Sequence, residues 1–291
     1  MKFGHHQSFY LRVNWLSKAI KMLKDDPQFF YDEFGFEKIG LGRNMAKSLR
    51  YWVLATTVMK EGKDDHQKPI HRLTEFGTLV SHYDRFIRLS LTSAVLHYLL
   101  ASNKDQATTW YWYFNEYGHR SSTNEDLLAA LNVWVMQHHN RSISANTLKR
   151  DLDCLKLMYT SHIRYEDDPE DVVASPLSGL GLLYDTKEKF VKHSPGLQQI
   201  DLDALYFGLL DYCHQYQVDS VTLEEIQVKP TLWGKLFHLS SNHILEALEL
   251  LHANPHYPVS FVRTNQIYSL NIDVEDAYAF LRKAYERKAA Y

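Results

Sequence analysis

Cysteine is scarce in this sequence. The 291 residues contain only Cys154 and Cys213, which stand far apart without a Cys-x-x-Cys pair. Disulfide-rich domains, zinc ribbons and iron–sulfur sites need several closely spaced cysteines, so the scarcity argues against all three. We therefore expect a reducing compartment.

Long apolar runs and a strong charge excess are also missing. No window approaches the roughly 18 consecutive apolar residues of a membrane span, and the first residues lack the basic-then-apolar run of a signal peptide. We expect a cytoplasmic protein with no membrane partner. The net charge is −3, so any affinity for nucleic acid must come from local clusters of Lys and Arg.

Complete catalytic motifs are not found. The stretch "GLGLLY" (179–184) has two glycines but no phosphate-loop lysine after them, which argues against nucleotide binding of the Walker type. The acidic residues of 166–171 surround a proline and are interpreted as a solvated loop. "HHNR" (138–141) and "SSNH" (240–243) match only fragments of a His-Asn-His nuclease. We expect no nucleotide, haem or zinc cofactor.

What is present is a repeated order of short elements. Apolar residues recur at helical spacing in 14–24, where Asn14 is the expected cap. A short helix at 36–40, a glycine turn and a long helix capped by Asn44 and ending near Met59 follow, and a polar tip at 60–69 lies between two β-like pieces. This order is typical of a winged helix-turn-helix.

The same order returns twice along the chain, with decreasing clarity. Residues 124–139 and 148–162 predict two helices of a second unit, and 221–254 predict three helices followed by a hairpin at 257–272. We expect a mainly α fold with small β-hairpins (α+β), built from winged helix-turn-helix units joined by helices. The predicted division is 1–82 (first unit), 83–120 (connecting helices), 121–175 (second unit), 176–218 (loop and helical connector, with the expected linker nearby) and 219–291 (C-terminal unit).

The long helix of the first unit carries a basic face. At about 100° per residue, Met45, Leu49, Trp52 and Val53 fall on one side, and Arg43, Lys47 and Arg50 fall on the other at i, i+4 and i+7 with no acid between them. A helix that enters a major groove needs this combination of an apolar back and a cationic front. The alternative is an ordinary solvated face.

The corresponding helices of the other units differ in charge. In 148–162, Lys149, Arg150 and Lys156 are expected outside the apolar face together with Asp151 and Asp153, so DNA contact and plain solubility remain open. The third long helix is expected to expose Glu246 and Glu249, which would repel phosphates. That unit is interpreted as a structural or partner-binding module.

The opening segment gathers polar groups in front of the first helix. His5, His6, Gln7 and Arg12 combine side chains that move protons near neutral pH with a guanidinium that forks onto phosphate. Together they could hold a scissile phosphate. The alternative is that they hydrogen-bond the segment onto the first unit.

Six segments in order resemble one family: "FGHHQSFYLRVNWLSKA", "IGLGRNMAKSLRYWVLA", "LTEFG", "ATTWYWYFNEY", "TLKRDLDCLKLMY" and "EDVVASPLSGLGLL". They are similar to the SspB-like family, a bacterial family of unknown-function domains whose recognised member is the DNA-nicking subunit of the Ssp DNA phosphorothioation system. The resemblance covers about residues 3–185. In relatives a single histidine precedes a small polar and an aromatic residue, a pattern that His6 and Phe9 match and that leaves His5 incidental.

The resemblance implies a function in DNA modification and antiviral defence. The protein would nick one strand of double-stranded DNA so that sulfur can replace a non-bridging phosphate oxygen. Its companions would be a cysteine desulfurase, an ATPase and an ATP-pyrophosphatase-like sulfurtransferase, and a divalent metal (Mg²⁺ or Mn²⁺) would be its cofactor.

Matching blocks and the helix faces together give the candidate residues. The predicted catalytic pair is His6 and Arg12. The predicted DNA-binding residues are Arg43, Asn44, Lys47, Arg50, Lys149 and Arg150. A non-catalytic DNA-binding subunit or regulator and a winged-helix scaffold for proteins are the alternatives, because fold does not fix function.

Overall fold

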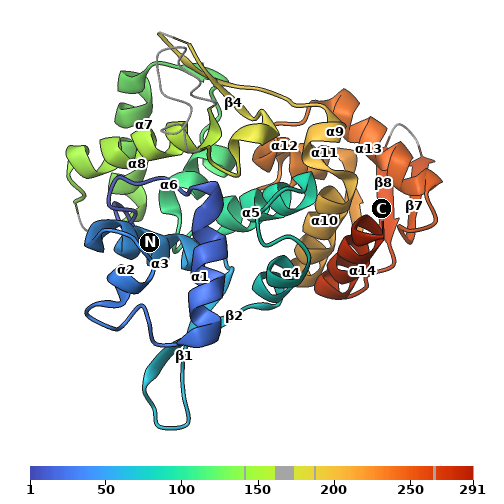
Figure 1. Cartoon of the computed structure of the whole chain (residues 1–291). Coiled ribbons are helices and arrows are strands. Elements are labelled where there is room, and N and C mark those ends of the chain that lie inside the picture. The colour runs from blue at the N-terminus through green and yellow to red at the C-terminus, as the bar shows by residue number, and fades with distance from the viewer. Residues whose placement is uncertain (141, 161–173, 187, 265–266, 291) are drawn as a thin grey trace.

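The structure, a computed structural model, describes residues 1–140, 142–160, 174–186, 188–264 and 267–290. It is a mixed α+β protein in which helices predominate and the sheets are small and antiparallel (Figure 1). None of the helices in the described ranges is long and apolar enough to cross a membrane. The predicted acidic loop at 166–171 and Arg141 lie outside these ranges.

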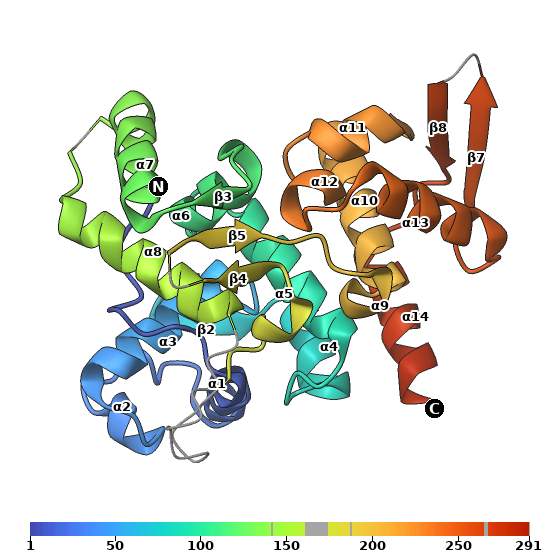
Figure 2. The same ribbon diagram turned by 90° about the horizontal axis from the view of Figure 1, so that it is seen from above.

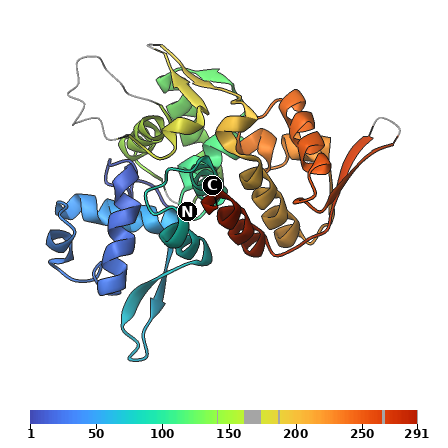
Figure 3. The same ribbon diagram turned by 45° about the vertical axis from the view of Figure 1, so that its right-hand side comes forward.

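The N-terminal part consists of four helices and a hairpin. Its elements are α1 (Val13–Asp25), α2 (Gly35–Lys38), α3 (Arg43–Ala55), β1 (Met59–Lys63), β2 (Pro69–Leu73) and α4 (Glu75–Tyr83). The β1–β2 hairpin projects away from the helices (Figures 1 and 3). The predicted order of elements is confirmed, and Thr74 caps α4 by accepting a 3.0 Å hydrogen bond from Gly77 N–H.

Three predicted helix boundaries in this part are wrong: the starts of α1 and α3, and the end of α3, which was expected near Met59. Arg12, not Asn14, occupies the N-cap position of α1, and Gly42, not Asn44, precedes α3; neither makes a side-chain cap. α3 stops at Ala55 because Thr57 takes a left-handed conformation with φ of 52°, which turns the chain into β1.

The central part surrounds one buried helix. Its elements are α5 (Ser90–Ser102), α6 (Thr108–Tyr111), the π-helix η1 (Trp112–Glu116), β3 (Ser121–Ser122), α7 (Asn124–His138), α8 (Ala145–Tyr159), the 3₁₀ turn η2 (Ser178–Leu180), β4 (Leu183–Asp185) and β5 (Phe190–Lys192). Ten residues of α5 are buried, and Figure 2 shows α5 between the N-terminal and C-terminal helices. The three strands pair in the order β3-β5-β4.

The C-terminal part repeats an order of short strand, helices and hairpin. Its elements are α9 (Leu197–Ile200), α10 (Leu202–Tyr216), β6 (Ser220–Thr222), α11 (Leu223–Val228), α12 (Trp233–Leu236), α13 (Ser241–Ala253), β7 (Val259–Thr264), β8 (Ile267–Ile272) and α14 (Ala277–Ala289). The strands pair in the order β6-β8-β7, so the predicted hairpin is confirmed. The connector 176–218 is more ordered than predicted, since it contains β4, β5 and α10.

One hydrophobic cluster joins all these parts, from Leu11 to Tyr285. α10 packs on α5 at Gly208, where a Cβ would lie 2.9 Å from the Tyr98 ring, so the small residue permits the close approach. His97 on α5 adds a polar link, since its Nε2–H donates to Leu236 O at 2.8 Å and its Nδ1 accepts from the Tyr159 hydroxyl at 2.7 Å. Burial lowers the pKa of His97 to about 4, which keeps the ring neutral in this bridge.

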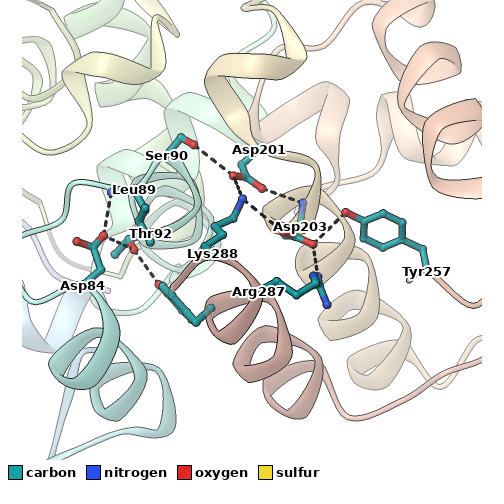
Figure 4. Close-up of polar contacts among 10 residues, drawn as sticks. Asp84, Leu89, Ser90, Thr92, Asp201, Asp203, Tyr257, Arg287 and Lys288 are labelled. Carbon is teal, nitrogen blue, oxygen red and sulfur yellow. Dashed lines mark hydrogen bonds and ion pairs between the residues drawn. The ribbon is translucent and has the colours of Figure 1, made fainter. Parts of the chain in front are cut away.

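Helix α14 is held in place by a polar network at its C-terminal end (Figure 4). Arg287 pairs with Asp203 at 2.7 Å, and Lys288 pairs with Asp201 at 2.8 Å. Tyr257 donates a hydrogen bond of 2.9 Å to Asp203. The network fixes α14 against the start of α10 and completes the C-terminal part.

Candidate nucleic-acid interface

Helix α3 presents the predicted cations on its outer face. Leu49, Trp52 and Val53 are fully buried, and Arg43, Asn44 and Lys47 are exposed. The amphipathic arrangement predicted from the sequence is confirmed. Neither Arg43 nor Lys47 forms an ion pair with any residue in the described ranges, so both charges are available to a ligand.

Arg50 differs from the other two cations. Its Nη2 donates to Glu61 Oε1 at 2.7 Å, and its guanidinium lies 4.4 Å from the centre of the Tyr31 ring. The hydrogen bond from Arg50 lowers the pKa of Glu61. Helix α3 itself contains no acidic residue, but Glu61 of the β1–β2 hairpin lies next to Arg50 and neutralises part of its charge.

A hollow of about 300 Å³ lies between the loop before α2 and α3. Its walls include Phe30 and Phe36 on one side and all three cations of α3 on the other. Asp32 and Glu33 also line it; Asp32 is already paired with Lys38 at 2.7 Å. The Arg43 guanidinium lies 5.4 Å from the Phe36 ring centre, so aromatic rings back the basic face.

The opening segment is fastened to two helices by His6. Its side chain is 1% exposed, and its Nε2 lies 2.7 Å from Asp151 Oδ1 on α8. Nδ1 accepts from Ser8 N–H at 3.1 Å, so Nε2 carries the hydrogen and donates it to the carboxylate. The ring also packs against Trp52 of α3 and Trp110 of α6, with centroids 6.1 and 5.9 Å away.

The Asp151 carboxylate accepts two further hydrogen bonds. Gly4 N–H donates to Oδ1 at 2.8 Å, and the Thr109 hydroxyl donates to Oδ2 at 2.7 Å. The sequence places this carboxylate on the outer face of α8, but it is 1% exposed. That expectation is wrong because the segment 4–8 folds over α8 and converts the position into an interior one.

The segment also binds α3 through the backbone. Phe9 O accepts hydrogen bonds from Ser48 Oγ at 3.1 Å and from Trp52 Nε1 at 2.9 Å. Since His6 is held by α8 three residues earlier, the opening segment joins the two predicted basic helices.

Lys149 and Arg150 lie directly before Asp151 on α8, and both are exposed without an ion pair in the described ranges. Lys156 was expected outside as well but is 8% exposed, with its ammonium 5.6 Å from the Phe190 ring centre. Burial lowers the pKa of Lys156. The strand β5, which sequence patterning did not reveal, covers this position.

Arg12 stands at the end of the opening segment. Its guanidinium lies 5.8 Å from the Tyr10 ring centre and 5.5 Å from that of Trp15. Its Nε is buried and has no hydrogen-bond partner among the described residues. No hydrogen bond joins Arg12 to His6 within the described ranges, so the two residues of the predicted catalytic pair are not directly hydrogen-bonded.

A metal centre is not formed by the residues described. No group of three or more His, Cys, Asp or Glu side chains within these ranges is arranged to hold a metal ion.

The residues that sequence reasoning missed are those that pair across the chain. Glu61 and Tyr31 contact Arg50, and Asp151 contacts His6, but nothing in their local sequence marks them as partners of predicted site residues. The separation of 145 residues between His6 and Asp151 explains why helical periodicity gave no signal.

Comparison with known proteins places the chain in a family. Two solved structures, described as an SspB crystal structure and a magnesium ion-bound SspB crystal structure, match all of this chain and 89% of theirs, with TM-scores of 0.86 and 0.87 and 21% identity. No curated protein matches. The model of a family described as a protein of unknown function, DUF4007, matches residues 3–285. The chain therefore belongs to the DUF4007 family and has the fold of SspB.

Proposed function

We propose that this protein binds double-stranded DNA through α3 and α8 and nicks one strand, as the DNA-nicking subunit of a bacterial phosphorothioate modification system. The observation that carries the proposal is the pair of exposed, unpaired cations Arg43 and Lys47 on α3, among the described residues, beside exposed Asn44. The SspB fold and the family membership support the same system.

The arrangement of elements supports winged helix-turn-helix units. In the first unit α3 is followed by the β1–β2 hairpin. In each of the other two units, a short strand before the helices (β3 or β6) pairs with the second strand of the hairpin (β5 or β8), which gives the orders β3-β5-β4 and β6-β8-β7. In this proposal α3 enters the major groove and the hairpin flanks the duplex. Phosphate contacts by Arg43, Lys47, Lys149 and Arg150 set the position of the protein on DNA.

For the nick itself, Arg12 is the proposed contact to the scissile phosphate, because its guanidinium offers a fixed fork of donors. His6 acts in the described conformation as a positioning residue, since its ring is 1% exposed and holds the segment that carries Arg12. A direct proton transfer by His6 requires residues 4–8 to open away from α8.

The proposed partners follow from the system. A cysteine desulfurase, an ATPase and an ATP-pyrophosphatase-like sulfurtransferase would act on the nicked strand after this protein. The proposed cofactor is Mg²⁺ or Mn²⁺.

The test is conversion of supercoiled plasmid to open circle by the purified protein, with Mg²⁺ or Mn²⁺ and with EDTA. We expect nicking that EDTA removes and that Arg12→Ala and His6→Ala abolish while duplex binding survives. Lys18→Ala is the matched control, because Lys18 is an exposed cation on α1, the helix that Arg12 directly precedes. Full nicking by both site variants would discard the assignment of Arg12 and His6.

A second function, DNA binding without cleavage, is favoured by one specific observation: His6 is enclosed rather than open to a substrate. It predicts retarded duplexes and no open circles under any metal condition. The salt slope of binding would still shrink when Lys47 or Arg50 is removed.

A further inference from the structure

A second cavity, remote in sequence from α3, lies where η1 and β5 meet the C-terminal helices. Its volume is about 380 Å³. Its lining residues are Phe114, Tyr117, Gly118, Arg120, Lys192, Ser194, Gln227, Val228, Gly234, Lys235, His238, Leu239 and Ser240. None of them belongs to the candidate nucleic-acid interface.

The charge of this lining has one sign. Arg120, Lys192 and Lys235 are cations, and no Asp or Glu is among the lining residues. None of the three forms an ion pair with a carboxylate in the part of the chain that is described. Three cations that share a cavity without a counter-charge repel one another, so the protein gains if an anion enters.

Lys192 is the most enclosed of the three. It is 8% exposed, and its Nζ donates to Tyr113 O at 2.8 Å and to Tyr117 O at 2.5 Å. An ammonium has three donors, so one N–H has no acceptor among the described residues. A buried ammonium without a carboxylate is costly, which makes this donor a strong attractor for an incoming oxyanion.

The electrostatics of the cavity disfavour the cationic form of Lys192 while no anion is bound. Burial and the nearby Lys235 lower the pKa of Lys192 to about 7. His238, which also lines the cavity, has its pKa lowered by burial and then by Lys192. Its Nε2 is buried and has no hydrogen-bond partner within the described ranges. The wall therefore carries unused hydrogen-bonding capacity as well as unbalanced charge.

We propose that this cavity binds a phosphate-class oxyanion, held by Lys192 at the back and by Arg120 and Lys235 nearer the solvent. Arg120 is exposed and Lys235 is half-buried, which leaves an entry for a phosphate group. The group comes either from a DNA strand or from free phosphate. The proposal goes beyond DNA binding by α3 and does not depend on it, because the two sites share no residue.

The test is calorimetric titration of the full chain with inorganic phosphate at constant ionic strength. We expect saturable binding that weakens by about tenfold or more in the Arg120→Ala/Lys235→Ala double variant, since each lost charged hydrogen bond is worth about that factor. The matched control is Lys21→Ala/Lys24→Ala, which removes two exposed cations on α1, outside both proposed sites, and should bind phosphate like the wild type. Lys192→Met, which keeps the length of the chain, should lose binding as well.

Two further titrations identify the source of the group. A short single-stranded oligonucleotide with a 5′-phosphate that competes with inorganic phosphate, while its 5′-hydroxyl counterpart does not, would support a DNA end as the occupant. Binding of inorganic phosphate without such competition would support free phosphate. No phosphate binding, or equal binding by wild type and Arg120→Ala/Lys235→Ala, would overturn the proposal. Phosphate binding by a protein that binds no duplex would leave this inference standing while the proposed function fails.

Discussion

Helices α3 and α13 occupy the same place in two similar runs of elements, each the last helix before a two-stranded hairpin. α3 exposes Arg43 and Lys47, and α13 exposes Glu246 and Glu249. The apolar backs of both helices are buried in the same way. The order of elements is therefore shared while the surface charge is opposite, and only the first helix has a surface suited to a polyanion.

The two ends of the molecule are also fastened differently. The opening segment is anchored by a fully enclosed pair, His6 and Asp151, with side chains 1% and 2% exposed. The last helix, α14, is anchored by Arg287 and Asp203, with side chains 30% and 10% exposed. Breaking an interaction that is shielded from water lowers the free energy of unfolding more than breaking an exposed one, so the two anchors should contribute unequally to stability.

The largest effect is expected from the enclosed anchor. His6→Ala removes a ring packed against two tryptophans and leaves a carboxylate oxygen short of a donor, which should lower the free energy of unfolding by about 3 kcal/mol. Arg287→Ala at the other anchor should cost about 1 kcal/mol. Thermal or urea unfolding of both variants measures the difference, and equal losses would contradict the ranking.

The next effect concerns the charge of α3. Arg43→Ala/Lys47→Ala should reduce the slope of log affinity for a duplex against log salt by about 2, because each phosphate contact contributes about 0.9. Fluorescence anisotropy with a labelled duplex at several salt concentrations gives the slope. The control Glu246→Gln/Glu249→Gln on α13 should leave the salt slope unchanged. A slope in Arg43→Ala/Lys47→Ala equal to that of the wild type would show that α3 is not part of the interface.

Charge reversal on α13 sharpens the comparison further. Glu246→Lys/Glu249→Lys gives the third unit a basic face like that of α3, and we expect affinity for a duplex to rise by no more than about tenfold at low salt. The same anisotropy titration measures the gain. A rise as large as the loss caused by Arg43→Ala/Lys47→Ala would indicate that net charge, rather than the placement of α3, governs binding.

The smallest effect is expected at the hairpin. Glu61→Gln removes the carboxylate that neutralises Arg50, so duplex affinity should rise by about two- to threefold, within the range of an exposed ion pair. Glu75→Gln is a matched control, since Glu75 pairs at 3.9 Å with Arg282 away from α3. Weaker binding by Glu61→Gln would mean that Arg50 serves the duplex only when Glu61 holds it.

Sequence periodicity predicted the helices of the first and third units well, because apolar residues at helical spacing report directly on a buried face. It placed Leu49, Trp52 and Val53 inside and Arg43 and Lys47 outside, as the structure has them. Strand β5 was missed, since a three-residue strand carries almost no pattern of its own.

The candidate site was less predictable than the fold. Asp151 was expected in solvent because a helical wheel shows only the helix, whereas its burial depends on a segment 145 residues earlier. Arg50 was expected to be free for the same reason, since Glu61 reaches it from the hairpin. Pairings between distant segments decide which polar groups remain available, and local sequence does not contain them.

The imidazole of His97 has a mechanical consequence. One of its nitrogens is hydrogen-bonded to Tyr159, the last residue of α8, and the other to the backbone oxygen of Leu236, the last residue of α12. A displacement of either helix end must strain the hydrogen bonds of the same rigid ring. The positions of the basic helix α8 and of the loop that carries His238 are therefore coupled through His97. A displacement of α8 would thus be transmitted to the end of α12 without any hinge between them.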